Sequence, residues 1–261
     1  MKENDVGELL DGHIAAVTGG GSGIGEAIAH GLAEHGAEVV ILDVNADAGN
    51  ETAKSIVAAG GKAASYELDV TDRSACNAVA TKIAADVGRL SILVNNAGIN
   101  RRTPITGDRD AVAQDWDDII DVNIKGVFNI THALLVPLRE SKGRIINIGS
   151  IQSFVHVRWP NSAAYTTSKH GVLGLTRSLA AELGKDGVRV NAIGPGLIET
   201  PLNKSMREAN PQMIADIMQH TPLGRPGKPQ DIVGPVVFLA SDLSAYVTGG
   251  ILMADGGFRS I

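Results

Sequence analysis

The stretch Thr18-Gly19-Gly20-Gly21-Ser22-Gly23-Ile24-Gly25 (TGGGSGIG, residues 18–25) decides the fold. It follows an apolar run, HIAAVT, that is typical of a buried strand, and it precedes a segment with helical spacing. A strand-to-helix turn this tight needs residues without a Cβ, so that backbone amides can approach a phosphate at the positive end of the helix. This context predicts a dinucleotide-binding βαβ unit; a turn of purely structural glycines is the alternative.

Short apolar runs and longer helical segments alternate along the rest of the chain. Strands are expected at residues 13–18, 38–43, 62–68, 91–96, 143–150, 187–193 and 250–255, and helices at 24–35, 46–59, 73–87, 116–138 and 163–183. This alternation predicts an α/β fold with a parallel sheet covered on both faces. With no repeat or linker in the sequence, we expect one domain over residues 1–261.

Residues 194–227 break the alternation, because prolines surround a short amphipathic helix. We interpret this segment as a mobile lid over the substrate, since long connections inside compact domains are often functional. An inert surface excursion is the alternative.

Composition narrows the class of partner. The formal net charge is −6, and no cluster of Lys and Arg suggests a nucleic-acid surface, so a small-molecule substrate is expected. The lone Cys76 excludes an intrachain disulfide and fits a reducing compartment. The N-terminal stretch is polar and lacks the features of a secretory signal, so a cytoplasmic protein is expected. The sequence contains no apolar run of roughly 20 residues, so no membrane span is expected.

Asp43 ends the second apolar run, 18 residues after Gly25. A carboxylate at this place accepts hydrogen bonds from the adenosine ribose and repels the 2′-phosphate of NADP. No Arg or Lys occurs between residues 38 and 53 to bind that phosphate, the first being Lys54. The sequence therefore predicts NAD as the cofactor; the alternative is that Asp43 caps the next helix.

Tyr165 and Lys169 stand four apart in a helical segment, so both side chains emerge on one helix face. A phenol is a weak base at neutral pH, but a neighbouring ammonium group favours the phenolate. Tyr165 is thus a candidate to take a proton from a substrate hydroxyl while a hydride leaves the carbon. Ser150, at the end of an upstream apolar run, is a candidate to hold the substrate oxygen. A Tyr-x-x-x-Lys pair alone is mostly structural, and Ser150 and the glycine turn give it weight.

These residues resemble the short-chain dehydrogenase/reductase family over almost the whole chain. The shared motifs, in the family's order, are TGGGSGIG, Asp43, Asp69-Val70, Asn95-Asn96-Ala97-Gly98, Asn123, Ser150, Tyr165-Thr166-Thr167-Ser168-Lys169, Pro195-Gly196 and Asp255-Gly256-Gly257. The resemblance implies a doubly wound Rossmann fold with a seven-stranded parallel sheet, helices on both faces and usually a homotetramer. It also implies an oxidoreductase that transfers a hydride between NAD(H) and a secondary alcohol or ketone.

The same resemblance assigns the site residues. The catalytic set is Asn123, Ser150, Tyr165 and Lys169. Asn123 would hold a water that relays protons from Lys169 to solvent; the alternative is a satisfied amide inside a helix. Asp69 and Val70 would lie beside the adenine, and Ile198 and Thr200 near the nicotinamide carboxamide. The cofactor-binding set is Gly19, Gly21, Ser22, Gly23, Ile24, Gly25, Asp43, Asp69, Val70, Asn96, Ala97, Gly98, Tyr165, Lys169, Pro195, Gly196, Ile198 and Thr200.

Arg101 and Arg102 follow the Asn-Asn-Ala-Gly motif at the expected ligand edge of the sheet and suggest an anionic substrate. Together with Ser150, Tyr165, Gln152 and Asn161 they are the candidate substrate residues, suited to a polyhydroxylated molecule. The stretch is similar to the gluconate and deoxygluconate dehydrogenase branch, which implies a sugar acid or polyol. Surface ion pairs are the alternative for the arginines.

Two rival functions remain open, a 3-oxoacyl-thioester reductase and a non-catalytic dinucleotide-binding protein. Residues 158–161 form an apparent insertion between Ser150 and Tyr165, beside the expected substrate pocket, and make transfer of a substrate from relatives less direct. The seven histidines include no HExxH motif and pair with no cysteine cluster, so no metal site is predicted.

Overall fold

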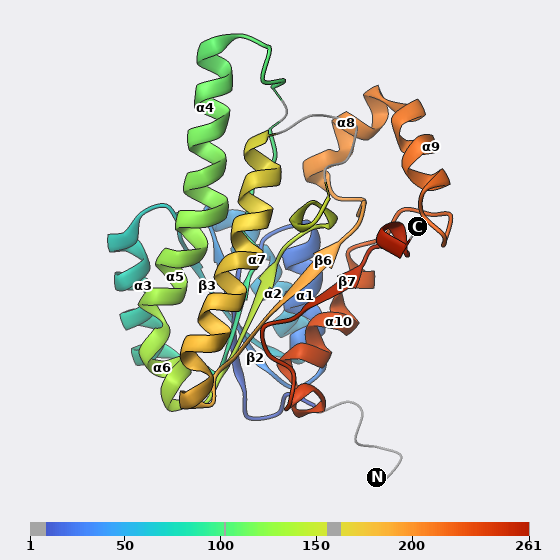
Figure 1. Ribbon diagram of the computed structural model, residues 1–261. Coiled ribbons are helices and arrows are strands. Elements are labelled where there is room, and N and C mark those ends of the chain that lie inside the picture. Colours follow the sequence, from blue (N-terminus) through green and yellow to red (C-terminus); the bar gives the residue numbers. More distant parts are fainter. Residues whose placement is uncertain (1–8, 102, 156–162, 261) are drawn as a thin grey trace.

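The computed structural model describes residues 9–101, 103–155 and 163–260. Its strands form one parallel sheet in the order β3-β2-β1-β4-β5-β6-β7, so the direction of winding reverses between β1 and β4 (Figure 1). The strands are β1 (Ile14–Thr18), β2 (Glu38–Asp43), β3 (Lys62–Glu67), β4 (Ile92–Asn95), β5 (Arg144–Ile148), β6 (Arg189–Pro195) and β7 (Ile251–Ala254). The seven-stranded doubly wound Rossmann fold expected from the sequence is confirmed.

Helices cover both faces of the sheet (Figure 1). They are α1 (Gly23–Glu34), α2 (Ala46–Ala58), α3 (Arg73–Asp86), α4 (Arg109–Ile120), α5 (Val127–Ala133), α6 (Leu135–Glu140), α7 (Ala163–Leu183), α8 (Lys204–Ala209), α9 (Pro211–Gln219) and α10 (Gln230–Ala240). α10 is not among the helices expected from the spacing. Short 3-10 turns lie at η3 (Ile151–Ser153), η4 (Gly184–Asp186), η5 (Pro201–Asn203), η6 (Asp242–Ser244) and η7 (Phe258–Ser260).

The core lies in two apolar layers, one on each face of the sheet. Alternate residues of β1 point to opposite layers: Val17 packs with α1 and α10, whereas Ala16 packs with residues of α3, α5 and α7. The strands between the two edges are buried on both faces, which explains why they are almost continuously apolar, whereas the edge strands β3 and β7 are partly exposed. None of the helices in the described ranges is both long enough and apolar enough to cross a bilayer.

The helix expected over residues 116–138 begins earlier and is divided. α4 starts at Arg109, after the Asp108 carboxylate accepts a 2.9 Å hydrogen bond from the Ala111 amide. The chain then forms a π-helix, η2 (Asp121–Gly126), before α5 and α6. Apolar periodicity missed the first turns of α4 because they are mostly polar and exposed, and a π turn shifts the periodicity on which the prediction rests.

The segment over residues 194–227 also differs from its expected form. Its first two residues complete β6, and it contains two helices, α8 and α9, where one was expected. Asn210 separates them, and Pro211 occupies the first position of α9, where a missing amide hydrogen costs nothing. Both helices lie above the carboxyl ends of β6 and β7 (Figure 1).

Candidate active site

A cavity of about 480 Å³ opens where several strands end. Its lining includes residues that follow β1, β4, β5 and β6, together with α7 and the segment containing α8 and α9. This is the edge of a doubly wound sheet at which ligands bind, next to the reversal of winding between β1 and β4. The fold therefore brings residues that are far apart in the sequence to one site.

The glycine turn after β1 is packed too closely for side chains. Gly19 has φ +63°, and a Cβ there would lie 3.0 Å from Cα of Ala97. The Asn96 side-chain amide donates 3.0 Å hydrogen bonds to the carbonyls of Thr18 and Gly19, which fixes the turn against the end of β4. These contacts explain why glycine follows Thr18.

The N-terminus of α1 faces the cavity through Ser22, Gly23 and Ile24. Ser22 precedes the helix, and within the described residues its side chain makes no capping hydrogen bond. The first helical amides and the helix dipole are therefore directed at a space lined by backbone, which fits a pyrophosphate group. The residues at this end of the cavity suit a dinucleotide.

Asp43 joins the second strand to the glycine turn. One carboxylate oxygen accepts a 2.8 Å hydrogen bond from the Gly21 amide, and the other accepts a 2.9 Å bond from the Asn45 amide. Asn45, whose side chain accepts from the Ala48 amide, is the N-cap of α2. The alternative that Asp43 itself caps this helix is wrong.

Asp69 and Val70 lie outside the cavity lining, as Asp43 does. The Asp69 carboxylate accepts two hydrogen bonds from Thr71, one from its amide at 2.9 Å and one from its hydroxyl at 2.7 Å. Val70 is buried against Gly126, where an added Cβ would lie 2.6 Å from the valine side chain. The structure thus fixes both residues in place without bringing them to the cavity.

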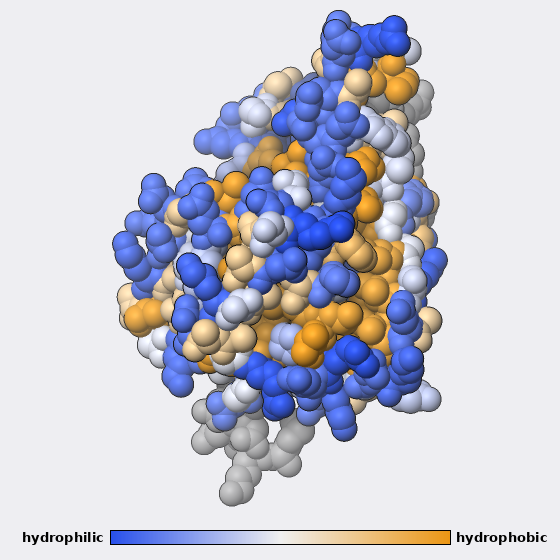
Figure 2. All heavy atoms as spheres, turned by 90° about the vertical axis from the view of Figure 1, so that its left-hand side faces the viewer, coloured by the Kyte–Doolittle hydropathy of each residue, from blue (hydrophilic) through white to orange (hydrophobic). Residues whose placement is uncertain are grey.

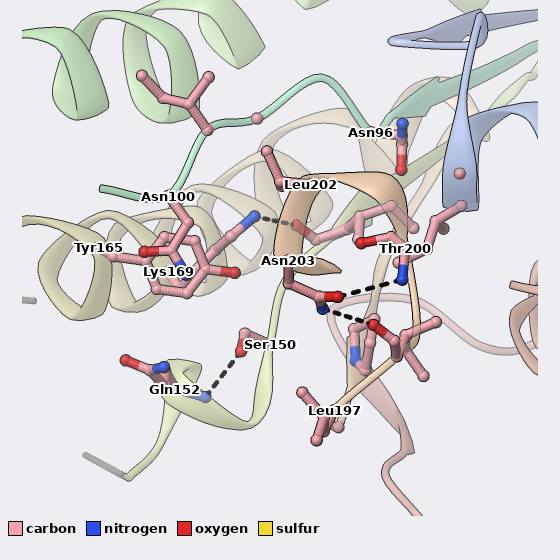
Figure 3. Close-up of a pocket in the computed structure, with 18 of the residues that line it drawn as sticks. Asn96, Asn100, Ser150, Gln152, Tyr165, Lys169, Leu197, Thr200, Leu202 and Asn203 are labelled. Atoms are coloured by element: carbon pink, nitrogen blue, oxygen red, sulfur yellow. Dashed lines mark hydrogen bonds between the residues drawn. The ribbon is translucent and has the colours of Figure 1, made fainter. Parts of the chain in front are cut away.

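Ser150, Tyr165 and Lys169 line the same cavity (Figure 3). Ser150 follows β5 and begins the 3-10 turn η3, where its hydroxyl accepts a 3.1 Å hydrogen bond from the Gln152 amide. Tyr165 and Lys169 come from α7, and the lysine Nζ lies 5.6 Å from the centroid of the tyrosine ring. The three groups expected to handle the substrate oxygen and its proton are brought together.

Lys169 is held below its ordinary basicity by burial. Its ammonium group donates a 2.7 Å hydrogen bond to the Ile148 carbonyl, and burial lowers the pKa of Lys169 from 10.5 to about 8. Desolvation is the cause, because it penalises the charged form. A lysine with this pKa remains mostly protonated at neutral pH.

Asn123 lies in the π-helix, behind the cavity wall. Its side-chain oxygen accepts a 2.9 Å bond from the Ile99 amide, and its nitrogen donates to the Ile99 carbonyl at 3.0 Å and to the Ser168 hydroxyl at 3.1 Å. The amide is therefore satisfied by protein groups, as the alternative stated. Its observed effect is to hold the loop after β4 against α7.

Comparison with known proteins now gives the family. A family model described as enoyl-(acyl carrier protein) reductase matches residues 19–259. The chain is 38% identical over 250 residues to a 3-oxoacyl-(acyl-carrier-protein) reductase of Thermotoga maritima, covering 95% of this chain and 98% of that protein. It is 39% identical over 255 residues to the 2-dehydro-3-deoxy-D-gluconate 5-dehydrogenase of Escherichia coli K12, covering 95% and 96%.

A solved structure agrees with these relatives. It is a gluconate 5-dehydrogenase from Burkholderia cenocepacia in complex with NADP and tartrate, with a TM-score of 0.91, 36% identity and 98% coverage of both chains. The chain belongs to the short-chain dehydrogenase/reductase family. This dehydrogenase/reductase is an oxidoreductase that acts on CH–OH groups with a nicotinamide dinucleotide, so the non-catalytic alternative no longer holds.

In this dehydrogenase/reductase Arg101, expected beside the substrate, does not line the cavity. Its guanidinium forms an ion pair with Asp118 and lies 3.7 Å from the carboxylate of Asp115, both on α4. Asp115 also accepts a 3.2 Å hydrogen bond from the Thr103 amide. Arg101 thus ties the loop after β4 to α4. Arg102, the other predicted arginine, lies outside the described residues.

Gln152 lies in the cavity as expected, and its side-chain oxygen accepts a 2.7 Å hydrogen bond from the Thr166 hydroxyl. Asn161 and the insertion at 158–161 lie outside the described residues. Of the residues expected beside the nicotinamide, Pro195, Gly196, Ile198 and Thr200 line the cavity. A Cβ on Gly196 would lie 2.8 Å from Cα of Asp255, which explains glycine there.

Sequence reasoning missed several lining residues of the dehydrogenase/reductase. Apolar side chains from residues 194–227 form one wall, namely Leu197, Leu202, Met206, Met213 and Ile217. The amphipathic pattern of α9 could have indicated part of that wall. Two amides were also missed, Asn100 and Asn203, and no local pattern distinguishes them. Asn203 donates a 2.6 Å hydrogen bond to the Ile198 carbonyl and accepts one from the Thr200 amide at 3.2 Å (Figure 3).

Proposed function

We propose that this enzyme transfers a hydride between NAD(H) and a secondary alcohol or ketone of a polyhydroxylated small molecule, a sugar acid or a polyol. The observation that carries the proposal is the shared cavity of Ser150, Tyr165 and Lys169 with the N-terminus of α1. Amide side chains in the same cavity, from Gln152 and Asn100, suit a substrate with several hydroxyl groups.

In the proposed oxidation, the Ser150 hydroxyl and the Tyr165 phenol hold the substrate oxygen. Tyr165, as phenolate, takes the hydroxyl proton while the carbon gives up a hydride, and the ketone forms; reduction reverses both transfers. A bound dinucleotide supplies the hydride acceptor or donor. Lys169 stabilises the phenolate by its positive charge. Asn123 is proposed to hold a relay water between Lys169 and solvent through a backbone group, because its side-chain amide is already paired with Ile99 and Ser168.

The glycine turn and the end of α1 would hold the pyrophosphate, and the residues from Asn96 to Gly98 would follow the cofactor. Asp69 and Val70 are proposed beside the adenine, and the stretch from Pro195 to Thr200 at the nicotinamide. Among these positions, close backbone packing supports Gly25 and Gly196 most directly, because an added Cβ would collide with the Gly19 carbonyl and with Cα of Asp255.

We propose NAD as the preferred cofactor, although the related Burkholderia structure holds NADP. The support is electrostatic: the Asp43 carboxylate lies against the glycine turn, and no Lys or Arg occurs between residues 3 and 53. A 2′-phosphate would meet a negative charge without a local cation. Comparison of kcat/KM with NAD and NADP tests the preference.

A carboxylate on the substrate needs a partner other than Arg101. Of the described residues that line the cavity, Lys169 is the only charged one. Arg102 therefore remains the proposed partner for a sugar-acid carboxylate, through two parallel hydrogen bonds. A neutral polyol would need no such group.

A 3-oxoacyl-thioester reductase is the second candidate, because the wall of leucine, isoleucine and methionine side chains from residues 194–227 suits an acyl chain. One experiment separates the candidates. The purified enzyme is incubated with NAD and a panel of sugar acids, polyols and hydroxy acids, and with NADPH and a 3-oxoacyl thioester, while absorbance of the reduced cofactor is followed. Turnover of the thioester alone would refute the proposed substrate class.

We also propose that residues 194–227 act as a substrate lid, that the enzyme is a homotetramer and that it works in the cytoplasm. The lone buried Cys76 suits a reducing compartment. Figure 2 shows apolar side chains gathered on the side of the molecule that carries α4 to α6. On these helices Trp116 (α4), Phe128 (α5) and Val136 (α6) are exposed. Such a surface suits an interface between subunits. Light scattering tests the assembly, since one chain has a mass of 27.1 kDa.

A further inference from the structure

Asn100 stands between two anchored residues in the loop after β4. The side chain of Asn123 holds both the amide and the carbonyl of Ile99, at 2.9 and 3.0 Å. On the other side, Arg101 is paired with Asp118. Because Ile99 is held by its backbone and Arg101 by its side chain, the Asn100 side chain has a defined place in the cavity, which it lines together with Tyr165.

The amide oxygen of Asn100 is buried and lacks a hydrogen-bond partner among the residues that the structure describes. The amides of Asn123, Gln152 and Asn203 all have partners. The oxygen of Asn95 is also buried without a partner among the described residues, but Asn95 does not line the cavity, whereas Asn100 does. In Figure 3 the Asn100 side chain points from its loop towards the part of the cavity that holds Tyr165 and Lys169. An unpaired buried acceptor is costly, and a partner from a ligand would remove that cost.

We propose that Asn100 determines specificity by accepting a hydrogen bond from a substrate hydroxyl on a carbon next to the reacting one. The inference rests on the proposed function and refines its substrate class to compounds with neighbouring hydroxyl groups. A vicinal hydroxyl supplies the donor that this oxygen needs. The carbons beside the ketone of a 3-oxoacyl thioester carry no such donor, so Asn100 selects against it.

The test compares substrates with and without the neighbouring hydroxyl. D-gluconate and galactitol have it, and 2-butanol, a simple secondary alcohol, lacks it. Asn100→Leu removes the acceptor at similar volume, Asn100→Asp keeps an acceptor, and Arg101→Met serves as the matched control because it loosens the same loop without altering the Asn100 amide. For each protein, kcat/KM is measured with each substrate, and NADH affinity is measured by fluorescence.

In Asn100→Leu, the preference for gluconate and galactitol over 2-butanol should fall about tenfold or more, which corresponds to roughly 1.4 kcal/mol. The affinity for NADH should stay the same. Asn100→Asp should retain the preference for galactitol, and Arg101→Met should lower activity on galactitol and 2-butanol by similar factors.

Three results would overturn the inference. If the wild type prefers the polyhydroxylated substrates and Asn100→Leu keeps that preference, Asn100 does not read the hydroxyl and the proposed function survives. Weaker NADH binding by the variant would assign the missing donor to the cofactor. A wild type without any preference for gluconate or galactitol over 2-butanol would refute the proposed function and this inference together.

Discussion

The ammonium group of Lys169 donates a 2.7 Å hydrogen bond to the carbonyl of Ile148, the last residue of β5. The end of a central strand thereby holds a buried cation next to the ring of Tyr165. Burying a charged ammonium group destabilises the folded protein. The enzyme nevertheless retains Lys169 at the place where the proposed proton transfer needs a positive charge.

Lys169→Met should abolish detectable turnover. It should also make the free energy of unfolding depend less on pH than it does in the wild type. The pKa of Lys169 is about 8 when folded and 10.5 in its ordinary state. Between these values the unfolded chain keeps a proton that the folded chain has released, so rising pH stabilises the folded wild type. Well below pH 8, Lys169 is protonated in both the folded and the unfolded chain, so it no longer makes the free energy of unfolding depend on pH.

Urea unfolding at pH 7.5 and pH 9.5 measures this effect, with the methionine variant as the control for all other titrating groups. The free energy of unfolding of the wild type relative to the variant should rise by roughly 1 kcal/mol or more between the two pH values. An unchanged or falling difference would show that burial does not lower the pKa of Lys169.

Tyr165→Phe removes the proposed proton carrier and leaves the glycine turn intact. We expect kcat to fall by roughly 10² to 10⁴, the range typical of a general acid or base, with little change in NADH affinity. Stopped-flow or steady-state kinetics and NADH fluorescence give the two readouts. Retention of more than about a tenth of the wild-type kcat would rule out this role for Tyr165.

The double substitution Asp43→Ala and Val44→Arg should shift the cofactor preference towards NADP. The change removes the carboxylate and adds a cation at an exposed neighbouring position, since Val44 is 67% exposed. Val44→Arg alone is the control, in which the carboxylate remains. The measurement is the ratio of kcat/KM with NAD and NADP, and a wild type that already favours NADP would contradict the proposed role of Asp43.

Arg101→Met and Asp118→Asn should have the same effect, because they break one ion pair. Both should raise KM for gluconate and galactitol alike, by less than about tenfold, since an exposed pair contributes little and the loop is only loosened. The double variant should add little to either change. A rise in KM confined to gluconate and to Arg101→Met would instead show that Arg101 leaves Asp118 to bind a carboxylate.

Local patterns predicted the sheet and the residues Ser150, Tyr165 and Lys169, which the fold brings to one cavity. Two of these patterns depend only on residues that are close in the sequence. They are the glycines between a strand and a helix, and the tyrosine and lysine on one helix face. Such patterns say nothing of distant partners: the charge of Arg101 suggested a ligand, but in the structure its partner is Asp118. Asp118 lies 17 residues further along the chain, on a helix whose first turns showed no periodicity. Competition between a substrate and an internal carboxylate is invisible without the fold.

The sequence by itself determined the doubly wound sheet, the glycine turn and the positions of Ser150, Tyr165 and Lys169, because apolar period, turn chemistry and helical spacing act over a few residues. Only the tertiary structure decided which polar groups are already paired. Asn123 and Arg101 use their hydrogen-bonding and charged groups within the protein, whereas the buried oxygen of Asn100 has no partner in the described chain. Whether a polar side chain is satisfied depends on neighbours brought from distant parts of the sequence, and its local sequence carries no record of them.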